Sequence, residues 1–571
     1  MNIKQIFEFK ILNDIFFRQD KLAIFIIVTF SLLTMILEIL SIGILIPLIS
    51  LLVLGVESLN LIKFEDYFFK DILLFFLTNI NYFILLIFLI FLIKNTFVLY
   101  SSYYQIKYFE KQNKNLSNKL FKNYLYKEYP FFINQNIAST LRNLRTEVGS
   151  AVLHLRSFIG LVSEIFIILG LLILLLYSSL TITLLIIIVF LPLIFVFHIL
   201  TKKKIYNLGL FRIDLESAVN KNIIQGIKSI KEIKLMNKEK VFNKEFNNNI
   251  DKLKANNIII NFIASTPRLA LEVLIVGSIL CSIIFLKYFD FNKVETISIL
   301  TVFTLSSIRM MPTISRIIQY LQTMKFRQAS LKLIDKELKV FSNNEKHDID
   351  KLDQISIPIE KIEIKNLYFG YSETKVINDL NYELKKNDIL GIVGKTGSGK
   401  STFVDLLTGL LDANSGKILV DGIDISKIRK SWQKEIAYVS QKIYLIDESI
   451  EKNIAFELDE NLIDKNKIRE AIKLAELENF IDSLKNKEKT IVGDNAIKLS
   501  GGQIQRIALA RAFYINKSIL IFDESTSALD ETTEKKIIEN IIKIKDKKII
   551  IFVSHKDSII NYCNKKLFIN H

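Results

Sequence analysis

The stretch Gly394-Lys395-Thr396-Gly397-Ser398-Gly399-Lys400-Ser401 decides the fold of the C-terminal part of this chain. It fits the phosphate-binding loop pattern G-x-x-x-x-G-K-S, follows an apolar run at 389–393 that predicts a strand, and precedes a helix-like stretch at 402–411. In that setting the glycines let backbone N–H groups turn towards phosphate oxygens, and the helix N-terminus adds positive potential. We therefore predict a nucleotide site in which Lys400 reaches the outer phosphates and the Ser401 hydroxyl binds Mg²⁺. Further contacts are expected from Gly394, Thr396, Gly397, Ser398, Gly399 and Thr402.

Two carboxylates follow a second apolar run. The run at 519–522 predicts another strand, and it ends in Asp523-Glu524. Asp523 is placed to hold Mg²⁺ directly or through water, and Glu524 is placed to polarise an attacking water as a general base. Carboxylates often follow strands, so an Asp-Glu pair alone is weak evidence for a nucleotide site. The phosphate-binding loop upstream makes that interpretation strong.

A third motif lies between these two. Leu499-Ser500-Gly501-Gly502-Gln503 resembles the signature sequence of the ATP-binding cassette family. The resemblance covers the region from about 358 to 571, where the family's other motifs occur in order. It implies that ATP is bound with Mg²⁺ and that the signature contacts nucleotide through Ser500, Gly501, Gly502 and Gln503.

The other cassette motifs supply further candidate residues. Tyr371, in Phe369-Gly370-Tyr371, resembles the aromatic residue that stacks on adenine. Gln441 resembles the glutamine that contacts Mg²⁺ and senses the membrane domain, and the segment 527–530 resembles the loop that crosses between two cassettes. His555 resembles the switch histidine that contacts the terminal phosphate. With Lys400, the resemblance makes Glu524, Gln441 and His555 the expected catalytic set.

The N-terminal part is dominated by six apolar runs, at 22–55, 72–100, 157–177, 180–200, 258–289 and 294–325. Each meets or exceeds the roughly 20 residues that a helix needs to cross a hydrocarbon layer about 30 Å thick. Runs of this length without alternation indicate helices, so we predict six spans. No small-residue cleavage site follows the first run, which we interpret as a retained span rather than a signal peptide.

Basic residues orient these spans. The segments 101–147 and 201–257 carry 8 and 13 lysines plus arginines, whereas 56–71, 178–180 and 288–293 carry 2, 0 and 1. This positive-inside bias predicts that both termini are cytoplasmic. The two basic loops also have a helical pattern, so we expect them to extend the spans into the cytoplasm; ordinary solvated loops are the alternative.

Composition narrows the class of protein. The chain has 571 residues, is 50% hydrophobic with a mean hydropathy of +0.32, and carries a net charge of +16. These values exclude a disordered chain and a secreted disulfide framework. In so apolar a chain we attribute the positive charge to cytoplasmic loops beside a lipid bilayer and not to nucleic-acid binding. We predict a membrane α-helical bundle at 1–326, a linker at 327–357 and an α/β P-loop nucleotide-binding domain at 358–571.

Pairing follows from the cassette resemblance. In that family the signature of one copy closes over the phosphates of the other, and this chain has one loop and one signature. A homodimer of half-transporters is therefore expected, with a heterodimer as the alternative. Six spans followed by one cassette resemble the exporter class. A soluble cassette ATPase is excluded by the spans, and Glu524 with His555 favours turnover over an ATP-gated channel or regulator.

Three basic residues lie within predicted spans: Lys94, Arg268 and Arg309. Each costs about 2.5–3.5 kcal/mol to insert, so such residues face a cavity or a partner. One interpretation is a cationic belt for an anionic head group, because arginine binds phosphate bidentately. The alternative is pairing with the intramembrane acids Glu38, Glu164 and Glu272.

The stretches 163–166, 265–269 and 308–318 resemble the bacterial lipid-linked oligosaccharide flippase of the protein N-glycosylation pathway. The resemblance implies a bacterial cytoplasmic membrane and a polyprenyl-pyrophosphate-linked saccharide, with Arg268 and Arg309 matching cavity arginines and Lys94 replacing a third. It also implies that 56–71 is a short external helix, where an ordinary outer loop is the alternative. The other cargoes considered are a phospholipid, a lipid A precursor, a peptide or a drug.

Overall fold

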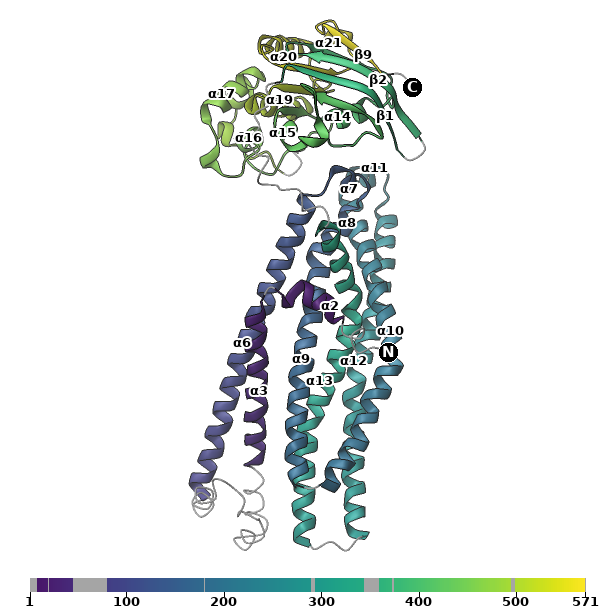
Figure 1. The fold of residues 1–571 in the computed structure, drawn as a ribbon, viewed down its shortest axis with the longest axis vertical. Helices are drawn as coiled ribbons and strands as arrows, with labels where there is room; N and C mark the ends of the chain where they lie inside the picture. The colour runs from purple at the N-terminus through teal and green to yellow at the C-terminus, as the bar shows by residue number, and fades with distance from the viewer. Residues whose placement is uncertain are drawn as a thin grey trace. The chain divides into compact units, whose positions relative to one another are not determined.

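The computed structural model describes residues 8–18, 20–44, 80–178, 180–288, 293–342, 359–371, 374–493 and 499–569. The chain divides into two compact units. The first comprises Met1–Lys127 and Asn134–Glu345, and the second comprises Glu128–Ile133 and Lys346–His571. The first unit is helical, whereas the second combines strands and helices (Figure 1).

Long helices make up the first unit, and short segments connect them. The long helices are α3 (Lys21–Gly43), α6 (Ile80–Leu125), α9 (Val148–Ser178), α10 (Leu180–Lys228), α12 (Glu239–Tyr288) and α13 (Lys293–Ser342). The short segments are α2 (Phe9–Leu12), the π-helices η1 (Asn13–Phe17) and η4 (Asn143–Glu147), α8 (Ile137–Arg142) and α11 (Ile230–Leu235). The short helix α7 (Tyr129–Asn134) falls almost entirely in the second unit. α6, α10 and α12 continue through the basic loops, which confirms the expected helical extensions.

Among the described residues, four helical stretches are long enough and apolar enough to cross a membrane. They are Lys21–Ser41, Asn81–Leu125, Ile137–Ile173 and Glu239–Gly277. The fourth and sixth predicted spans fall on α10 and α13, which are helical throughout. The total of six membrane-spanning helices therefore remains a prediction. The segment 56–71, predicted as an external helix or an outer loop, lies outside the described residues.

The predicted linker at 327–357 begins inside a helix. α13 runs unbroken from Lys293 to Ser342, so the first 16 residues assigned to the linker are helical. Ala329, Leu331 and Ile334 are buried there, and this packing explains why the helix continues after the apolar density of the sequence falls. Residues 343–358 lie outside the description.

A buried cluster of charges joins three helical segments of the first unit. The Arg212 guanidinium on α10 donates to Glu147 Oε2 at 2.9 Å, to Glu216 Oε1 at 2.8 Å and to Ser330 Oγ at 2.8 Å. Glu147 belongs to η4 and Ser330 to α13, and both are fully buried. Because an unpaired charge at this depth would be strongly destabilising, the cluster fixes how the three segments are aligned.

The second unit contains two sheets. The antiparallel sheet has the order β2-β1-β4-β5, and the parallel sheet has the order β6-β7-β8-β3-β9. The strands are β1 (Lys361–Tyr371), β2 (Thr374–Lys385), β3 (Ile389–Val393), β4 (Ser415–Val420), β5 (Ile423–Asp424), β6 (Ile436–Val439), β7 (Ile519–Asp523), β8 (Ile549–Val553) and β9 (Lys565–Phe568). The helical segments are α14 (Lys400–Leu407), η5 (Ile425–Lys427), α15 (Arg429–Lys434), α16 (Ile450–Ala455), η6 (Glu460–Leu462), α17 (Lys465–Leu474), α18 (Glu478–Asp482), η7 (Lys487–Lys489), α19 (Gly501–Ile515), α20 (Glu531–Lys543) and α21 (Asp557–Ile560).

The parallel sheet brings the predicted nucleotide motifs to one edge. β3, β8 and β7 are neighbours, so the segments that follow their carboxyl ends meet there. The residues of β7 and β8 are buried throughout, as expected for strands covered by helices on both faces. Trp432 fixes the far end of α14, because its buried indole Nε1–H donates to the Leu407 carbonyl at 2.7 Å.

Candidate nucleotide site

The phosphate-binding loop joins β3 to α14, as the sequence predicts. Gly399 caps the helix with φ at 100°, a left-handed conformation, and a Cβ there would lie 2.5 Å from Val376 Cγ1. Only glycine fits both conditions. Lys400 is 7% exposed and folds back over the loop, donating to the carbonyls of Gly394 at 2.8 Å and Lys395 at 3.0 Å. Its ammonium group is thus held at the edge where phosphates are expected.

The loop residues fit a bound nucleotide. Ser398 Oγ is buried without a hydrogen-bond partner in the described part of the chain, and Lys400 is held by carbonyl groups rather than by a carboxylate. A buried hydroxyl and a buried ammonium in this arrangement suit phosphate oxygens. Ser401 and Thr402 follow Lys400 in the first turn of α14, and Thr396 and Gly397 are exposed. The hydroxyl, amide and carboxylate oxygens of Ser401, Gln441 and Asp523 are the hard donors that Mg²⁺ prefers.

Four predicted catalytic side chains form one network. Gln441 Nε2 donates to Glu524 Oε2 at 2.6 Å, and Glu524 Oε1 lies 3.3 Å from His555 Nε2. The same His555 nitrogen lies 3.1 Å from Lys400 Nζ. Three of these residues follow the ends of parallel strands β6, β7 and β8, and Lys400 begins α14. The sheet therefore brings together residues that are as far apart as 155 positions in sequence.

Glu524 has an unusual backbone. Its φ is 46°, and its N–H donates to the Val553 carbonyl at 3.0 Å. A non-glycine residue in the left-handed region is uncommon, and such strain is often found at functional sites. The conformation orients the Glu524 carboxylate towards Gln441 and His555 instead of continuing the line of β7.

Asp523 has a partner that the sequence analysis missed. The Tyr438 hydroxyl, on β6, donates to Asp523 Oδ2 at 3.0 Å. Burial raises the pKa of the Asp523 carboxyl, and the neighbouring Glu524 carboxylate raises it further. Burial and the charge of Asp523 together raise the pKa of Asp405, on α14, to about 6. No sequence signal identifies Tyr438, because its contact with Asp523 joins residues 85 positions apart.

The signature residues sit at the start of α19. Ser500 is the N-cap: Gln503 N–H donates to Ser500 Oγ at 3.3 Å, and Ser500 N–H donates to Gln503 Oε1 at 2.8 Å. This capping box holds the positive end of a 15-residue helix in place beside the exposed Gly501. Such an end suits the phosphates of a nucleotide. Tyr371 ends β1 with 43% of its surface exposed, packed edge-on against Phe369, and so presents a ring face for stacking.

The predicted cargo residues do not form a comparable network. Lys94 and Glu38 form an ion pair at 3.2 Å with 5% and 6% of their side chains exposed. Arg268 is exposed on α12. Arg309 lies on α13, and its side chain is outside the description. Glu164 pairs with Arg316, which the sequence analysis did not consider, at 2.5 Å and 3.1 Å.

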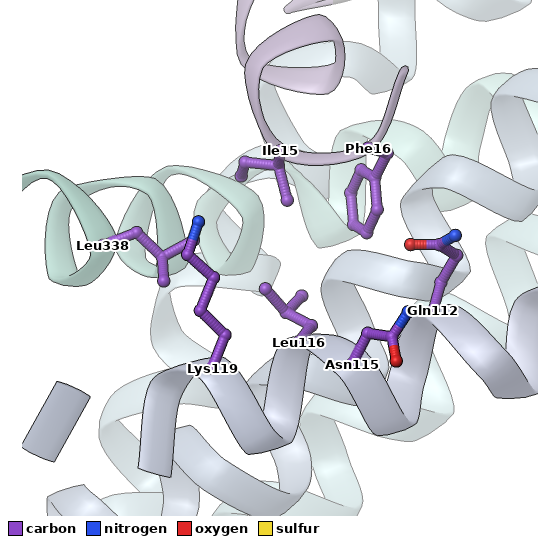
Figure 2. A pocket seen from close by; sticks show the side chains of 7 residues that line it. All are labelled: Ile15, Phe16, Gln112, Asn115, Leu116, Lys119 and Leu338. Atoms are coloured by element: carbon purple, nitrogen blue, oxygen red, sulfur yellow. The ribbon is translucent and has the colours of Figure 1, made fainter. Parts of the chain in front are cut away.

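A small pocket lies elsewhere in the first unit, where η1 packs against α6 and α13. Figure 2 shows Ile15 and Phe16 of η1 pointing towards Leu116 on α6. The complete lining is Ile15, Phe16, Gln112, Asn115, Leu116, Lys119 and Leu338. None of the predicted site residues lines this pocket.

Two family models match the chain. The one described as the ABC transporter transmembrane region matches residues 22–313, and the one described as ABC transporter matches residues 377–527. The first match alone covers half of the chain.

Individual relatives match mainly through one part of their length. The alpha-hemolysin translocation ATP-binding protein HlyB of Escherichia coli O157:H7 is 38% identical over 229 residues, or 37% of this chain and 32% of that protein. The ATP-dependent lipid A-core flippase of Saccharophagus degradans is 37% identical over 209 residues, or 36% of this chain and 35% of that protein. The matched region thus spans about a third of the length of these relatives.

One solved structure resembles nearly the whole chain. It is described as the structure of a bacterial Atm1-family ABC exporter with ATP bound. The TM-score is 0.79 at 18% identity, covering 97% of this chain and 94% of that one. The likeness confirms the predicted fold class, a helical transmembrane domain fused to an α/β P-loop nucleotide-binding domain.

Proposed function

The chain belongs to the ABC transporter family, and from this premise we propose that two copies of it form an ATP-driven exporter of an anionic amphiphile. The observation that carries the proposal is the network of Lys400, His555, Glu524 and Gln441. These side chains combine an ammonium for phosphate with a carboxylate that accepts a proton from water. A channel or regulator that binds ATP without hydrolysing it does not need that carboxylate.

Each residue has a distinct role in the proposed reaction. Lys400 and the N–H groups of the loop hold the phosphates, and Tyr371 stacks on the base. Glu524 takes the proton of the attacking water, while Gln441 and His555 hold its carboxylate in place. Mg²⁺, when bound by Ser401, Gln441 and Asp523, supplies positive charge to the phosphate oxygens.

The assembly is proposed to be a homodimer. The capped, exposed start of α19 supports it, because Ser500–Gln503 are available to a nucleotide held by a second copy. The proposed domains are 1–326, 327–357 and 358–571, the second beginning within α13. We propose that both termini are cytoplasmic on the distribution of lysine and arginine, and that the membrane is a bacterial cytoplasmic membrane on the resemblance to the bacterial flippase.

The cargo is proposed to be an anionic lipid. The exposed Arg268 within a membrane helix supports a negatively charged head group. The relatives are named as a lipid A-core flippase and a toxin translocation protein, so they favour another cargo, such as a lipid A precursor or a peptide, over a polyprenyl-pyrophosphate-linked saccharide. Compensation of Lys94 by Glu38 also removes one charge from the proposed cationic belt. The lipid-linked saccharide is therefore the second candidate.

Reconstitution into proteoliposomes tests the proposal. ATP-dependent flipping is compared for a phosphorylated lipid A precursor, a polyprenyl-pyrophosphate-linked saccharide and a neutral lipid. We expect transport of an anionic lipid by the wild type, loss in Glu524→Gln, and reduced transport in Arg268→Ala with ATPase activity retained. Equal transport of the neutral lipid, or an unchanged rate in Arg268→Ala, would refute the anionic cargo. A Glu524→Gln variant that still transports would refute the ATP-driven exporter.

A further inference from the structure

Three lysines surround one carboxylate at the start of α2, beside α13. Lys332 Nζ on α13 lies 3.1 Å from Glu8 Oε1, and Gln328 Nε2 donates to the same oxygen at 2.7 Å. Lys325 Nζ donates to Gln328 Oε1 at 3.1 Å, so a neutral amide holds this ammonium group. Among the described residues, the charged groups that act on Lys325 are Glu8, Lys332 and Lys202 of α10. Three ammonium groups of the described chain therefore share this carboxylate.

This group of charges lies at one boundary of the apolar layer. Lys202 comes shortly after the apolar run at 180–200, and Lys325 is the last residue of the run at 294–325. The segment 8–18, which begins with the carboxylate, precedes the first apolar run. The lysines are therefore placed at the level of lipid head groups, and their side chains are half-buried or exposed.

Aromatic rings accompany the lysines at this level. Phe9 adjoins Glu8 in the chain, and 49% of its surface is exposed. Its ring centre lies 5.7 Å from that of Phe17 and 6.3 Å from that of Phe158, at the start of the apolar run at 157–177. Phenylalanine together with lysine is typical of segments that lie in the interface between water and acyl chains. The region thus combines an apolar contact for acyl chains with positive charge for a head group.

We propose that Lys202, Lys325 and Lys332 bind the phosphodiester of an anionic phospholipid in the leaflet beside segment 8–18. That leaflet is cytoplasmic in the proposed orientation. The lysines carry more charge than Glu8 neutralises, and the lipid phosphate supplies the missing anion. A free phosphate has the same charge but no acyl chain to contact the exposed Phe9 ring. The bound lipid ties the N-terminal segment to α10 and α13, at a place separate from the proposed cargo site.

Lipid binding to the purified full-length chain tests this site. Native mass spectrometry without ATP or cargo measures the affinity for phosphatidylglycerol, with phosphatidylcholine as the uncharged reference. We expect Lys325→Gln to weaken phosphatidylglycerol binding about fivefold and Lys202→Gln/Lys325→Gln about twenty-fivefold, with phosphatidylcholine binding unchanged. Lys240→Gln/Lys244→Gln, at exposed positions of α12 well before its apolar run, is the matched control and is expected to change neither affinity. Wild-type phosphatidylglycerol binding in the double variant at Lys202 and Lys325 would overturn the inference.

A change at Glu8 separates lipid binding from a purely structural role of the lysines. We expect Glu8→Gln to strengthen phosphatidylglycerol binding about threefold, because the carboxylate that competes with the lipid for the lysines is removed. Melting temperatures are compared in nanodiscs of phosphatidylcholine and of an equal mixture with phosphatidylglycerol. The wild type and Glu8→Gln are expected to melt higher in the mixture, whereas Lys202→Gln/Lys325→Gln melts equally in both. Weaker phosphatidylglycerol binding in Glu8→Gln would overturn the inference.

Two further measurements identify the ligand. Free glycerol phosphate is expected to leave the melting temperature unchanged, and protection equal to that by phosphatidylglycerol would overturn the lipid as the ligand. Arg268→Ala is expected to keep wild-type phosphatidylglycerol binding. Loss of that binding in Arg268→Ala would place the lipid in the cargo site and overturn the inference. A chain that binds phosphatidylglycerol as expected but flips no lipid would support this site and refute the proposed function.

Discussion

The charged residues of the two units behave in opposite ways. In the nucleotide-binding unit, Lys400, Glu524 and His555 come from three segments and converge on one another. In the membrane unit, Lys94 is fully engaged by Glu38, and Arg316 by Glu164. The difference shows that residues which bind a ligand of fixed chemistry, such as ATP, occur at a fixed spacing in the sequence, whereas the charges of these two membrane pairs compensate each other. Arg268 is exposed and departs from that pattern.

The largest effect is expected from Glu524→Gln. Because the amide cannot accept the proton of the attacking water, we expect ATPase activity to fall about a thousandfold with ATP binding retained. Phosphate release and equilibrium ATP binding measure the two quantities. Glu539→Gln, the same change at an exposed position of α20, is the control and is expected to leave both unchanged. Unchanged turnover in Glu524→Gln would show that convergence in the nucleotide unit is not catalytic.

A second prediction concerns compensation in the membrane unit. Lys94→Met removes the cation that faces the buried Glu38 carboxylate, and we expect a loss of about 3 kcal/mol in unfolding free energy. The pair of changes Lys94→Met and Glu38→Gln removes both charges and is expected to recover most of that loss. Thermal unfolding in lipid nanodiscs is the measurement. A double variant that is stable yet no longer stimulated by cargo would show that Lys94 serves transport and would break the contrast drawn above.

A third prediction tests the tight geometry of the phosphate-binding loop. Gly399→Ala is expected to cost about 1–3 kcal/mol, because it combines an unfavourable φ with a 2.5 Å approach to Val376. Gly422→Ala is the matched control, since Gly422 has a similar φ of 84° with nothing within 4 Å of an added Cβ. Thermal unfolding of both variants separates steric conflict from backbone strain. Equal losses would mean that Val376 moves aside.

The smallest effect is a pH dependence at Asp405. The folded pKa of Asp405, raised to about 6, lies above the value of about 3.9 in an unfolded chain. The folded state therefore binds more protons, and this group's unfavourable contribution grows as the pH rises from about 4 through about 6. Asp405→Asn is expected to raise the melting temperature more at about pH 8 than at about pH 5, measured without Mg²⁺. The exposed Asp546→Asn is the control, and an equal shift at both pH values would contradict the prediction.

More of the nucleotide-binding unit than of the membrane unit could be predicted from the sequence. The loop at 394–401 is local, so its strand, turn and helix could be predicted from neighbouring residues. The role of Tyr438 could not be predicted, because it acts on a segment far away in sequence and carries no spacing pattern. In the membrane unit, length and hydropathy predict helices, but pairing depends on how α3 packs against α6. The sequence therefore left the Lys94–Glu38 pair as one of two alternatives.

The cluster around Arg212 has a mechanical consequence. Its hydrogen bonds to Glu147 and Ser330 are short and buried, whereas the one to Glu216 is part-buried and lies within α10 itself. Translating α10 by one helical turn against η4 would separate the buried charges of Arg212 and Glu147, and translating it against α13 would break the bond to Ser330. We therefore expect α10, η4 and α13 to move as one rigid body around Arg212. Any bending of these helices during the transport cycle then takes place away from Arg212.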